Sequence, residues 1–397
     1  MRSIETGVRG DSISGRGVRR ERSSATPPKL VLPDLGRRQT ATISRLFSES
    51  VQIGQAVNTS YLVNPEWLSL VDEPAIEPGR PICDPHHHLW DRPGNRYLAE
   101  ELTADLRSGH NIVSTVFVEC GAAYRVDGHE ALKPLGETEF VVHEHERAAA
   151  MFASPTNIAA GIVGFADLRA GVEVDKVLAA HIDVGAGRFR GIRHAAATNA
   201  DPEVSGHRIM PALGLLGDAE FRAGFSCLHA AGLSFEAWLY HPQLQELCDL
   251  AKAFPETSIM LNHVGGPLGI GSYANDRAAV FSQWSDAIAL LAKCKNVHVK
   301  LGGLGMELCG FGWERMPRPP SSEEFAAAIE PFVGHCIDCF GVERSMFESN
   351  FPVDKTSCSY GVLWNAFKRL ARSYTATERD ALFYDSAARF YRLDDLI

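Results

Sequence analysis

The 397-residue sequence contains no apolar run that approaches the ~20 residues needed to span a bilayer, and no apolar segment of the secretory type. Positive charge is also scarce, because 39 Lys and Arg stand against 49 Asp and Glu, for a formal net charge of -10. These absences argue against membrane lipid and nucleic acid as main partners. A small-molecule substrate fits this composition, and whether the chain forms a homo-oligomer is left open.

The nine cysteines lack the paired spacing of a metal-binding finger. The one close pair, Cys336 and Cys339, falls in a segment that we predict to be helical, so we interpret these thiols as helix packing rather than as a redox site. Scattered free thiols are typical of a reducing compartment, so the sequence predicts a cytoplasmic protein.

The first fifty residues differ in composition from the rest of the chain. They are rich in Arg, Ser, Gly and Pro and lack apolar periodicity, which predicts a disordered or solvated, poorly ordered N-terminal arm over residues 1–50. A transit peptide is the alternative, although acidic residues within the arm disfavour it. We expect residues 51–80 to be a lead-in segment that packs on the domain formed by residues 81–397.

From residue 81 onward, short apolar runs rich in β-branched residues alternate with amphipathic segments of helical period. Eight runs are expected to be strands: 81–90, 111–120, 158–168, 188–196, 232–241, 257–266, 296–303 and 344–354. Strict alternation of strands and helices predicts a parallel sheet covered by helices. Eight units over about 300 residues match an α/β fold of the (β/α)8 TIM-barrel type. An open doubly wound sheet is the alternative, but no glycine-rich phosphate loop follows the first run.

The sharpest local signal is the segment DPHHH at residues 84–88, which ends the first run. Because side chains alternate across a strand, we expect Asp84, His86 and His88 on one side and His87 on the other. Two imidazoles at this spacing can hold one divalent ion or polarise one substrate carbonyl. His86 and His88 are therefore the first candidates for a site at the carboxyl ends of the strands.

Other polar residues follow the strand ends in the same way. His263 closes the sixth run before two glycines, which permit a close approach by a ligand. Arg193, at the end of the fourth run, is a candidate clamp for a substrate carboxylate, because a guanidinium pairs with planar anions through two hydrogen bonds. His194, Glu119 and Trp90 are further candidates for contacts with a substrate.

The eighth run ends at Asn350, with Glu348 on the same side of the strand. An amide cannot act as a general base, but it can donate a hydrogen bond to a developing oxyanion or orient a water molecule. Asp354 is the nearest carboxylate in the following loop that could replace the missing base. A role as a helix cap is the alternative for Asp354.

Taken in order, five motifs resemble the amidohydrolase-2 branch of the amidohydrolase superfamily, and within it a lactonase-like subgroup. The motifs lie between residue 81 and about residue 394, and they read DPHHHLWD, GIRH, NHVGGP, MFESNFPVD and YDSAARFYRL. The resemblance implies that His86, His88 and His263 either bind one divalent metal, with zinc favoured, or polarise a carbonyl without any metal. The fifth-strand histidine of the metal-dependent pattern is missing here, and Asn350 replaces the eighth-strand acid.

The residues and the resemblance together predict a hydrolase of a lactone or related cyclic ester that bears a carboxylate. In this hypothesis the three histidines polarise the carbonyl, Arg193 holds the carboxylate, and Asp354, Glu348 or Glu119 activates water. One alternative is a metal-dependent amidohydrolase or non-oxidative decarboxylase. Another is a barrel that binds a ligand without turnover.

Overall fold

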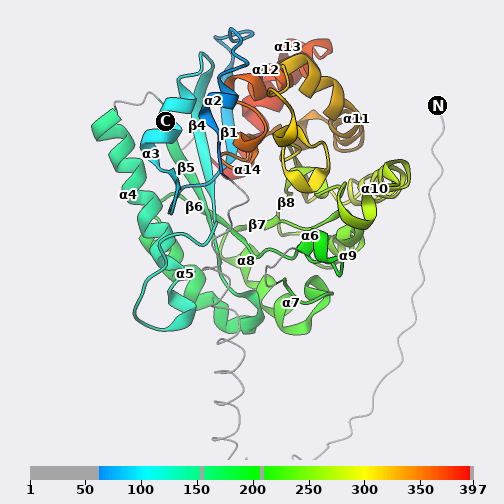
Figure 1. Cartoon of the computed structure of the whole chain (residues 1–397). Coiled ribbons are helices and arrows are strands. Elements are labelled where there is room, and N and C mark those ends of the chain that lie inside the picture. The colour runs from blue at the N-terminus through cyan, green and yellow to red at the C-terminus, as the bar shows by residue number, and fades with distance from the viewer. Residues whose placement is uncertain (1–61, 153–155, 206–209, 394–397) are drawn as a thin grey trace, which may run out of the picture. The chain divides into compact units, whose positions relative to one another are not determined.

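The computed structural model describes residues 62–152, 156–205 and 210–393 (Figure 1). The predicted arm over residues 1–50 lies outside the described residues, as does the first part of the lead-in segment. Within the described ranges, no helix combines the length and the apolar character that crossing a membrane requires. All nine cysteines carry free thiols, and Cys336 and Cys339 lie in a helix, as the sequence predicts.

Eight parallel strands follow one another in chain order within a single sheet, which curves into a barrel with helices around it (Figure 1). The strands are β1 (Pro81–His87), β4 (Asn111–Val118), β5 (Asn157–Gly164), β6 (Phe189–Arg193), β7 (Ser234–Ala237), β8 (Ile259–Leu261), β9 (Val297–Leu301) and β10 (Ser345–Phe347). This order confirms the predicted TIM barrel, because a doubly wound sheet would reverse its strand order. A short hairpin, β2 (Trp90–Arg92) and β3 (Asn95–Tyr97), follows β1.

The barrel closes between the segment after β10 and the end of β1. The Asn350 N–H donates to the carbonyl of His86 (2.9 Å), and the His88 N–H donates to the carbonyl of Phe351 (2.8 Å). His87 and Phe351 form an isolated parallel bridge between these two bonds. The closing seam therefore runs through the histidine segment itself.

Most of the helices connect successive strands and cover the outside of the barrel. The longer ones are α3 (Ala99–Leu106), α4 (Leu135–Phe152), α5 (Asp175–Val184), α9 (Leu244–Ala253), α10 (Arg277–Leu291), α11 (Ser322–Phe340) and α12 (Tyr360–Leu370). The shorter ones are α2 (Pro65–Leu68), α6 (Pro202–Ser205), α7 (Ala219–Phe225), α8 (Cys227–Ala230), α13 (Ala376–Asp380) and α14 (Ser386–Tyr391).

Local sequence explains where the long helix α11 begins and ends. Ser321 accepts a hydrogen bond from the Glu324 N–H through its side chain, and the Glu324 carboxylate accepts one from the Ser321 N–H. This reciprocal capping satisfies two backbone donors at the start of the helix. Gly341 follows the last turn with a φ of +77°, a conformation that glycine adopts without a steric penalty.

Strand side chains form two separate apolar layers. One layer packs against the surrounding helices and includes Phe235, Leu261 and Val299. The other lies inside the barrel, and its strand members are Cys83, Val116, Val118, Ala160, Val163, Met260 and Met346. Ala387, Ala388, Phe390, Tyr391 and Leu393, from α14 and the residues directly after it, complete this inner layer.

The helix α14 lies at the amino ends of the strands. The inner residues that it contacts, such as Cys83 and Met346, precede the polar residues His86 and Glu348 on the same chain segments. Since parallel strands share one direction, α14 closes the barrel on the side opposite to the histidines.

The described part of the lead-in segment contacts the rest of the domain at several points. The indole N–H of Trp67 donates to the carbonyl of Met316 (2.9 Å), and the Ile76 N–H donates to the side-chain oxygen of Asn365 (2.7 Å). Asn365 belongs to α12, so this segment is fastened to the outer helical layer.

Candidate active site

His86, His88 and His263 lie together at the carboxyl ends of β1 and β8. The ring centroid of His86 is 4.9 Å from that of His88 and 4.5 Å from that of His263. None of the three side chains is more than 4% exposed. The structure thus brings His263 into one cluster with His86 and His88, from which it is distant in the sequence.

Asp84 does not share the side of β1 that His86 occupies, so strict alternation gave a wrong expectation here. The pairing of β1 with β4 shifts register after Asp84, next to Pro85, which has no N–H for a neighbouring strand. The Asp84 carboxylate instead accepts hydrogen bonds from the Tyr360 hydroxyl (2.9 Å) and the Ser349 N–H (2.9 Å). Burial raises the pKa of Asp84 to about 6.

Glu348, the first residue after β10, joins two of the histidines. Its Oε2 lies 2.7 Å from His86 Nδ1, and its Oε1 lies 2.7 Å from His263 Nδ1. The same Oε1 also accepts the backbone N–H of His263 (3.1 Å). Glu348 is completely buried, and burial raises its pKa to about 8. An acid therefore does stand at the end of the eighth strand, two residues before the Asn350 to which sequence reasoning gave that position.

Two glycines after β9 make room for this arrangement. A Cβ at Gly302 would lie 2.5 Å from Cγ of Glu348, and a Cβ at Gly303 would lie 2.4 Å from Cγ of His263. Gly303 also has a φ of +68°. The Gly302–Gly303 pair is thus a steric requirement of the cluster, in addition to ending the strand.

The turn at His263 is held in an unusual backbone conformation. His263 and the β-branched Val264 have φ values of +53° and +48°, and the next two residues, Gly265 and Gly266, are also left-handed. Such values are strained for residues other than glycine and collect at functional sites. The Trp284 indole N–H donates to the Val264 carbonyl (2.7 Å) and fixes the turn.

Each imidazole of the cluster has its Nδ1 engaged. For His86 and His263 the neighbour is Glu348, and for His88 it is the carbonyl of Val118 at 2.7 Å. A carbonyl can only accept, so His88 carries its proton on Nδ1 and leaves the Nε2 lone pair available. Burial first, and then the positive charges nearby, lower the pKa of all three imidazoles well below the ordinary value, so the rings are neutral at pH 7.

Two cations flank His86, and each has a carboxylate partner. Lys300 Nζ lies 3.3 Å from His86 Nδ1 and 2.8 Å from Glu236 Oε2. Arg193 Nη1 lies 3.4 Å from His86 Nε2, while its Nε is 2.7 Å from Glu119 Oε1 and its Nη2 donates to the Glu119 carbonyl. Of the Arg193 nitrogens with these contacts, Nη1 is the one that points at the cluster.

Sequence reasoning missed Glu236, which forms an ion pair with Lys300. Both side chains are completely buried inside the barrel. The available signal was an acid in the middle of an apolar strand, SFEA on β7, because a buried charge requires a partner of opposite sign. That partner, Lys300, stands in the apolar run HVKL of β9.

Trp90 and His194 have different surroundings. Trp90 stacks on His88 at a centroid distance of 5.9 Å, so it borders the cluster. His194 lies between Phe165 (5.2 Å) and Phe221 (5.4 Å), and its Nδ1 accepts the N–H of Leu168. These contacts place His194 in the packing outside the strands.

Asn350 and Asp354 contact each other. The Asn350 amide donates to Asp354 Oδ1 (2.8 Å), and Asp354 Oδ2 accepts the Gly305 N–H (2.9 Å). Asn350 has a φ of +54°, which asparagine tolerates better than most residues. Burial raises the pKa of Asp354 to about 8. These bonds tie the loop after β9 to the loop after β10, and Asp354 begins a short 3-10 turn rather than capping it.

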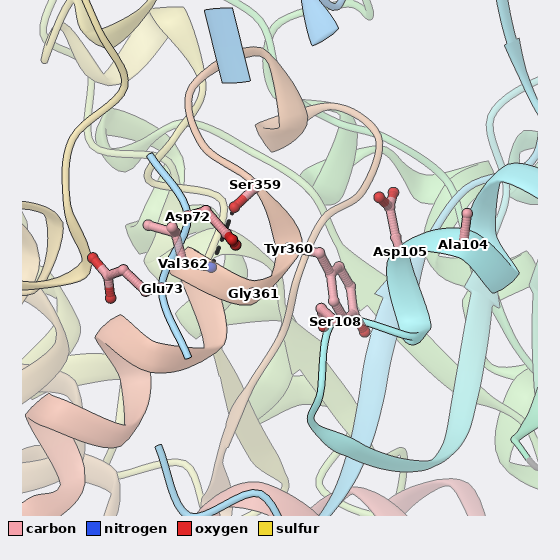
Figure 2. Close-up of a pocket in the computed structure, with 9 residues that line it drawn as sticks. All are labelled: Asp72, Glu73, Ala104, Asp105, Ser108, Ser359, Tyr360, Gly361 and Val362. Carbon is pink, nitrogen blue, oxygen red and sulfur yellow. Dashed lines mark hydrogen bonds between the residues drawn. The ribbon is translucent and has the colours of Figure 1, made fainter. Parts of the chain in front are cut away.

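A cavity of about 170 Å³ lies at another place on the barrel (Figure 2). Asp105 of α3 and the first residues of α12 line it, together with Asp72 and Glu73 of the lead-in segment. Tyr360 lines this cavity (Figure 2), and its hydroxyl donates to Asp84. None of the site residues predicted from the sequence lines it.

Part of the cluster has the composition of a metal site. One nitrogen from each of His86 and His263 and one oxygen of Glu348 lie within 4.8 Å of one another. Imidazole nitrogens and carboxylate oxygens are the usual ligands of zinc, and histidines with one nitrogen bonded to protein can bind a metal through the other. The donor set therefore fits one divalent ion, although a cation lies close to each ring nitrogen of His86.

The chain belongs to the amidohydrolase family of hydrolases, whose family model, described as "Amidohydrolase", matches residues 83–393. This range agrees with the extent of the resemblance found in the sequence.

Among individual relatives, the uncharacterized protein y4mH of Sinorhizobium fredii is 34% identical over 342 residues, which are 79% of this chain and 98% of that protein. An L-fucono-1,5-lactonase of Burkholderia multivorans is 28% identical over 237 residues, 59% of this chain and 72% of that enzyme. A crystal structure of a Burkholderia multivorans amidohydrolase with bound zinc shares the fold, with a TM-score of 0.58 and 24% identity over 78% of this chain and 99% of that one.

Glu137, near the start of α4, supports the loop that carries Glu119. Its Oε1 accepts the backbone N–H groups of Cys120 (2.9 Å) and Ala122 (2.8 Å), directly after Glu119. Burial, reinforced by the Glu119 carboxylate, raises the pKa of Glu137 to about 8. The sequence carries no motif that marks this residue.

We expect Gly303→Ala to lower the free energy of unfolding by more than the backbone strain of an alanine with positive φ accounts for. Gly187→Ala is the matched control, because Gly187 has a φ of +75° and no atom within 4 Å of its added Cβ. The control should cost about 1 kcal/mol from backbone strain, and Gly303→Ala several times more, because its Cβ meets His263. Urea unfolding followed by tryptophan fluorescence measures both. Equal losses would contradict the steric role of Gly303.

Glu137→Gln should change how stability depends on pH. A folded-state pKa of about 8, above the unfolded value of 4.5, means that the folded state holds its proton more tightly. The stability associated with protonated Glu137 is complete below about pH 4.5 and falls as the pH rises towards 8, by up to about 1.4 kcal/mol per pH unit. Relative to Glu137→Gln, the wild-type protein should therefore lose stability between pH 5 and 8 in urea titrations.

The control for this pH series is Glu139→Gln, on the same helix. Arg125 lowers the pKa of Glu139 through a hydrogen bond, so the contribution of Glu139 is lost only below its ordinary titration range. Its difference from the wild-type protein should stay constant between pH 5 and 8. A constant difference for Glu137→Gln as well would show that Glu137 ionises normally.

Proposed function

We propose that the protein hydrolyses a lactone, with Glu348 and His263 acting together as the base that activates water. The observation that carries this proposal is the single buried carboxylate in contact with Nδ1 of both His86 and His263. A carboxylate on one imidazole nitrogen orients the ring and raises the basicity of the other nitrogen. The pair supplies the base that Asn350 could not.

In the first step, a water molecule gives a proton to Nε2 of His263 while its oxygen bonds to the carbonyl carbon of the lactone. Glu348 stabilises the resulting imidazolium through the Nδ1–H that faces its Oε1. Because the pKa of Glu348 is raised to about 8, the carboxylate form that this step requires increases as the pH rises towards 8.

The former carbonyl oxygen becomes an oxyanion, which Arg193 Nη1 is suited to receive as a hydrogen-bond acceptor. When the carbonyl re-forms, the bond between the carbon and the ring oxygen breaks. The leaving oxygen takes the proton from His263, so the products are one hydroxyl group and one carboxylic acid, which then releases its proton to solvent. Each atom and proton of the water molecule is then accounted for, and the cluster returns to its neutral state.

The surroundings of Arg193 favour a neutral lactone over one that bears a carboxylate. Glu119 neutralises the guanidinium and engages two of its nitrogens, so Arg193 is less suited to clamp a second carboxylate than the sequence suggested. The relative named L-fucono-1,5-lactonase supports a sugar-derived substrate. We therefore extend the proposal to sugar lactones as the class to test first.

Replacement of either member of the pair should abolish turnover without unfolding the protein. We expect His263→Ala and Glu348→Gln each to lower kcat by 10²- to 10⁴-fold, the usual contribution of a general base. The measurement is the acid released from a panel of sugar lactones. His143→Ala, an exposed histidine with a 68% exposed side chain on α4, is the control and should retain full activity. Full activity in His263→Ala would rule out this assignment.

A metal-dependent hydrolase is the second candidate, because His86, His263 and Glu348 together form an acceptable donor set. A bound divalent ion would polarise the carbonyl and lower the pKa of a coordinated water molecule. In that case too, Arg193 Nη1 would donate to the oxyanion.

Metal analysis separates the two candidates. Because Lys300 and Arg193 lie beside the two ring nitrogens of His86, we expect much less than one zinc per chain after purification without chelators or metal-affinity resin. We also expect lactone hydrolysis to survive incubation with a chelator. About one zinc per chain, with activity lost on chelation and restored by zinc, would establish the metal-dependent candidate.

A further inference from the structure

We propose that the C-terminal helix α14, at the amino ends of the strands, positions His86 through a chain of buried side chains. This chain runs from Tyr391 to Glu236 to Lys300. This inference rests on the proposed function only in taking His86 as a member of the reactive cluster. Tyr391, Glu236 and Lys300 are thus positioning residues, because none of them is required to touch a substrate.

The chain of contacts is continuous. The Tyr391 hydroxyl donates to Glu236 Oε1, and the Asn262 amide donates to Glu236 Oε2. Lys300 Nζ lies 2.8 Å from that same Oε2 and 3.3 Å from His86 Nδ1. All five side chains are completely buried. Charges at this depth interact strongly with their neighbours, so the loss of one member shifts the others.

The position of Lys300 influences which nitrogen of His86 carries the proton. Arg193 donates towards Nε2, which favours the Nδ1–H form, and Glu348 Oε2 lies 2.7 Å from Nδ1, a position compatible with a hydrogen on that nitrogen. The Lys300 ammonium can only donate, and it faces Nδ1, so it favours the opposite form. The tautomer of His86 is therefore a balance, and the distance of Lys300 from the ring sets that balance.

The distance of Lys300 depends in turn on α14. A lysine side chain is long and flexible, and here Glu236 and the Tyr391 ring, 5.4 Å from Nζ, restrain it from the amino-end side. Tyr391 is itself fixed, because Phe390 packs on His298 (4.9 Å) and Arg392 donates to the Gly232 carbonyl (3.0 Å). The helix α14 thereby fixes the position of the Lys300 ammonium beside His86.

The molecule contains a matched trio that serves as an internal control. The Tyr97 hydroxyl donates to Asp105 (2.7 Å), and Lys355 Nζ lies 2.7 Å from the same carboxylate. This tyrosine–carboxylate–lysine set has the same chemistry as the trio under His86. Tyr97→Phe therefore removes an equivalent buried hydroxyl without touching the contacts of His86.

The experiment uses the full chain with ¹⁵N-labelled histidine and records the two-bond ¹H–¹⁵N correlations of the imidazole rings. His86→Gln identifies the His86 signals. Lys300→Met should shift these signals towards the Nδ1–H form, because it removes the opposing donor. Tyr391→Phe should give a smaller shift in the same direction, because Glu236 then draws Lys300 away from the ring. Tyr97→Phe should leave the His86 signals unchanged.

If Tyr391→Phe does not fold, Glu236→Gln replaces it, because it weakens the same hold on Lys300. Unchanged His86 signals in Lys300→Met, or equal shifts in Tyr391→Phe and Tyr97→Phe, overturn the inference. The spectra need no substrate, so they stand even if the wild-type protein opens no lactone and the proposed function fails. On an active substrate, Tyr391→Phe should lower kcat about tenfold at nearly constant KM, the pattern of a misplaced reactive group.

Discussion

The contact of one buried carboxylate, Glu348, with two imidazoles is the interaction on which the rest of the site depends. It requires the end of β10 to meet the ends of β1 and β8, so it exists only in a barrel whose first and last strands have joined. It also requires Gly302 and Gly303, since a methyl group at either position would occupy the space of Glu348 or His263. Burial then raises the pKa of Glu348 and lowers the pKa of the neighbouring imidazoles.

Each positive charge that flanks this contact has a carboxylate partner. Lys300 faces Glu236 and Arg193 faces Glu119, so neither cation is left alone in the low-dielectric interior. Glu348 remains as the carboxylate whose contacts are with histidines rather than with a lysine or arginine. In the proposed mechanism the proton is therefore handled by Glu348 and His263, while the surrounding ion pairs provide a fixed electrostatic field.

Much of this arrangement could be predicted from the sequence, because it depends on the local alternation of apolar and polar residues along the chain. Eight apolar runs, and a histidine at the end of the first and sixth, are enough to expect a barrel and a strand-end cluster. The turn of Asp84 towards Tyr360 could not be predicted, because it depends on a register shift beside Pro85. Nor could the contacts of Glu348 be predicted, because Glu348 and Asn350 both follow β10, and the point at which this short strand ends is not marked in the sequence.

The closing seam of the barrel has a consequence for how this protein loses activity. Two backbone hydrogen bonds of the seam belong to this segment: the carbonyl of His86 accepts from Asn350, and the N–H of His88 donates to Phe351. A seam is where a barrel can part while each helix keeps its own internal bonds. In this protein, opening of the seam would separate Glu348 from His86. A molecule could then keep nearly all of its secondary structure and still lack the assembled cluster.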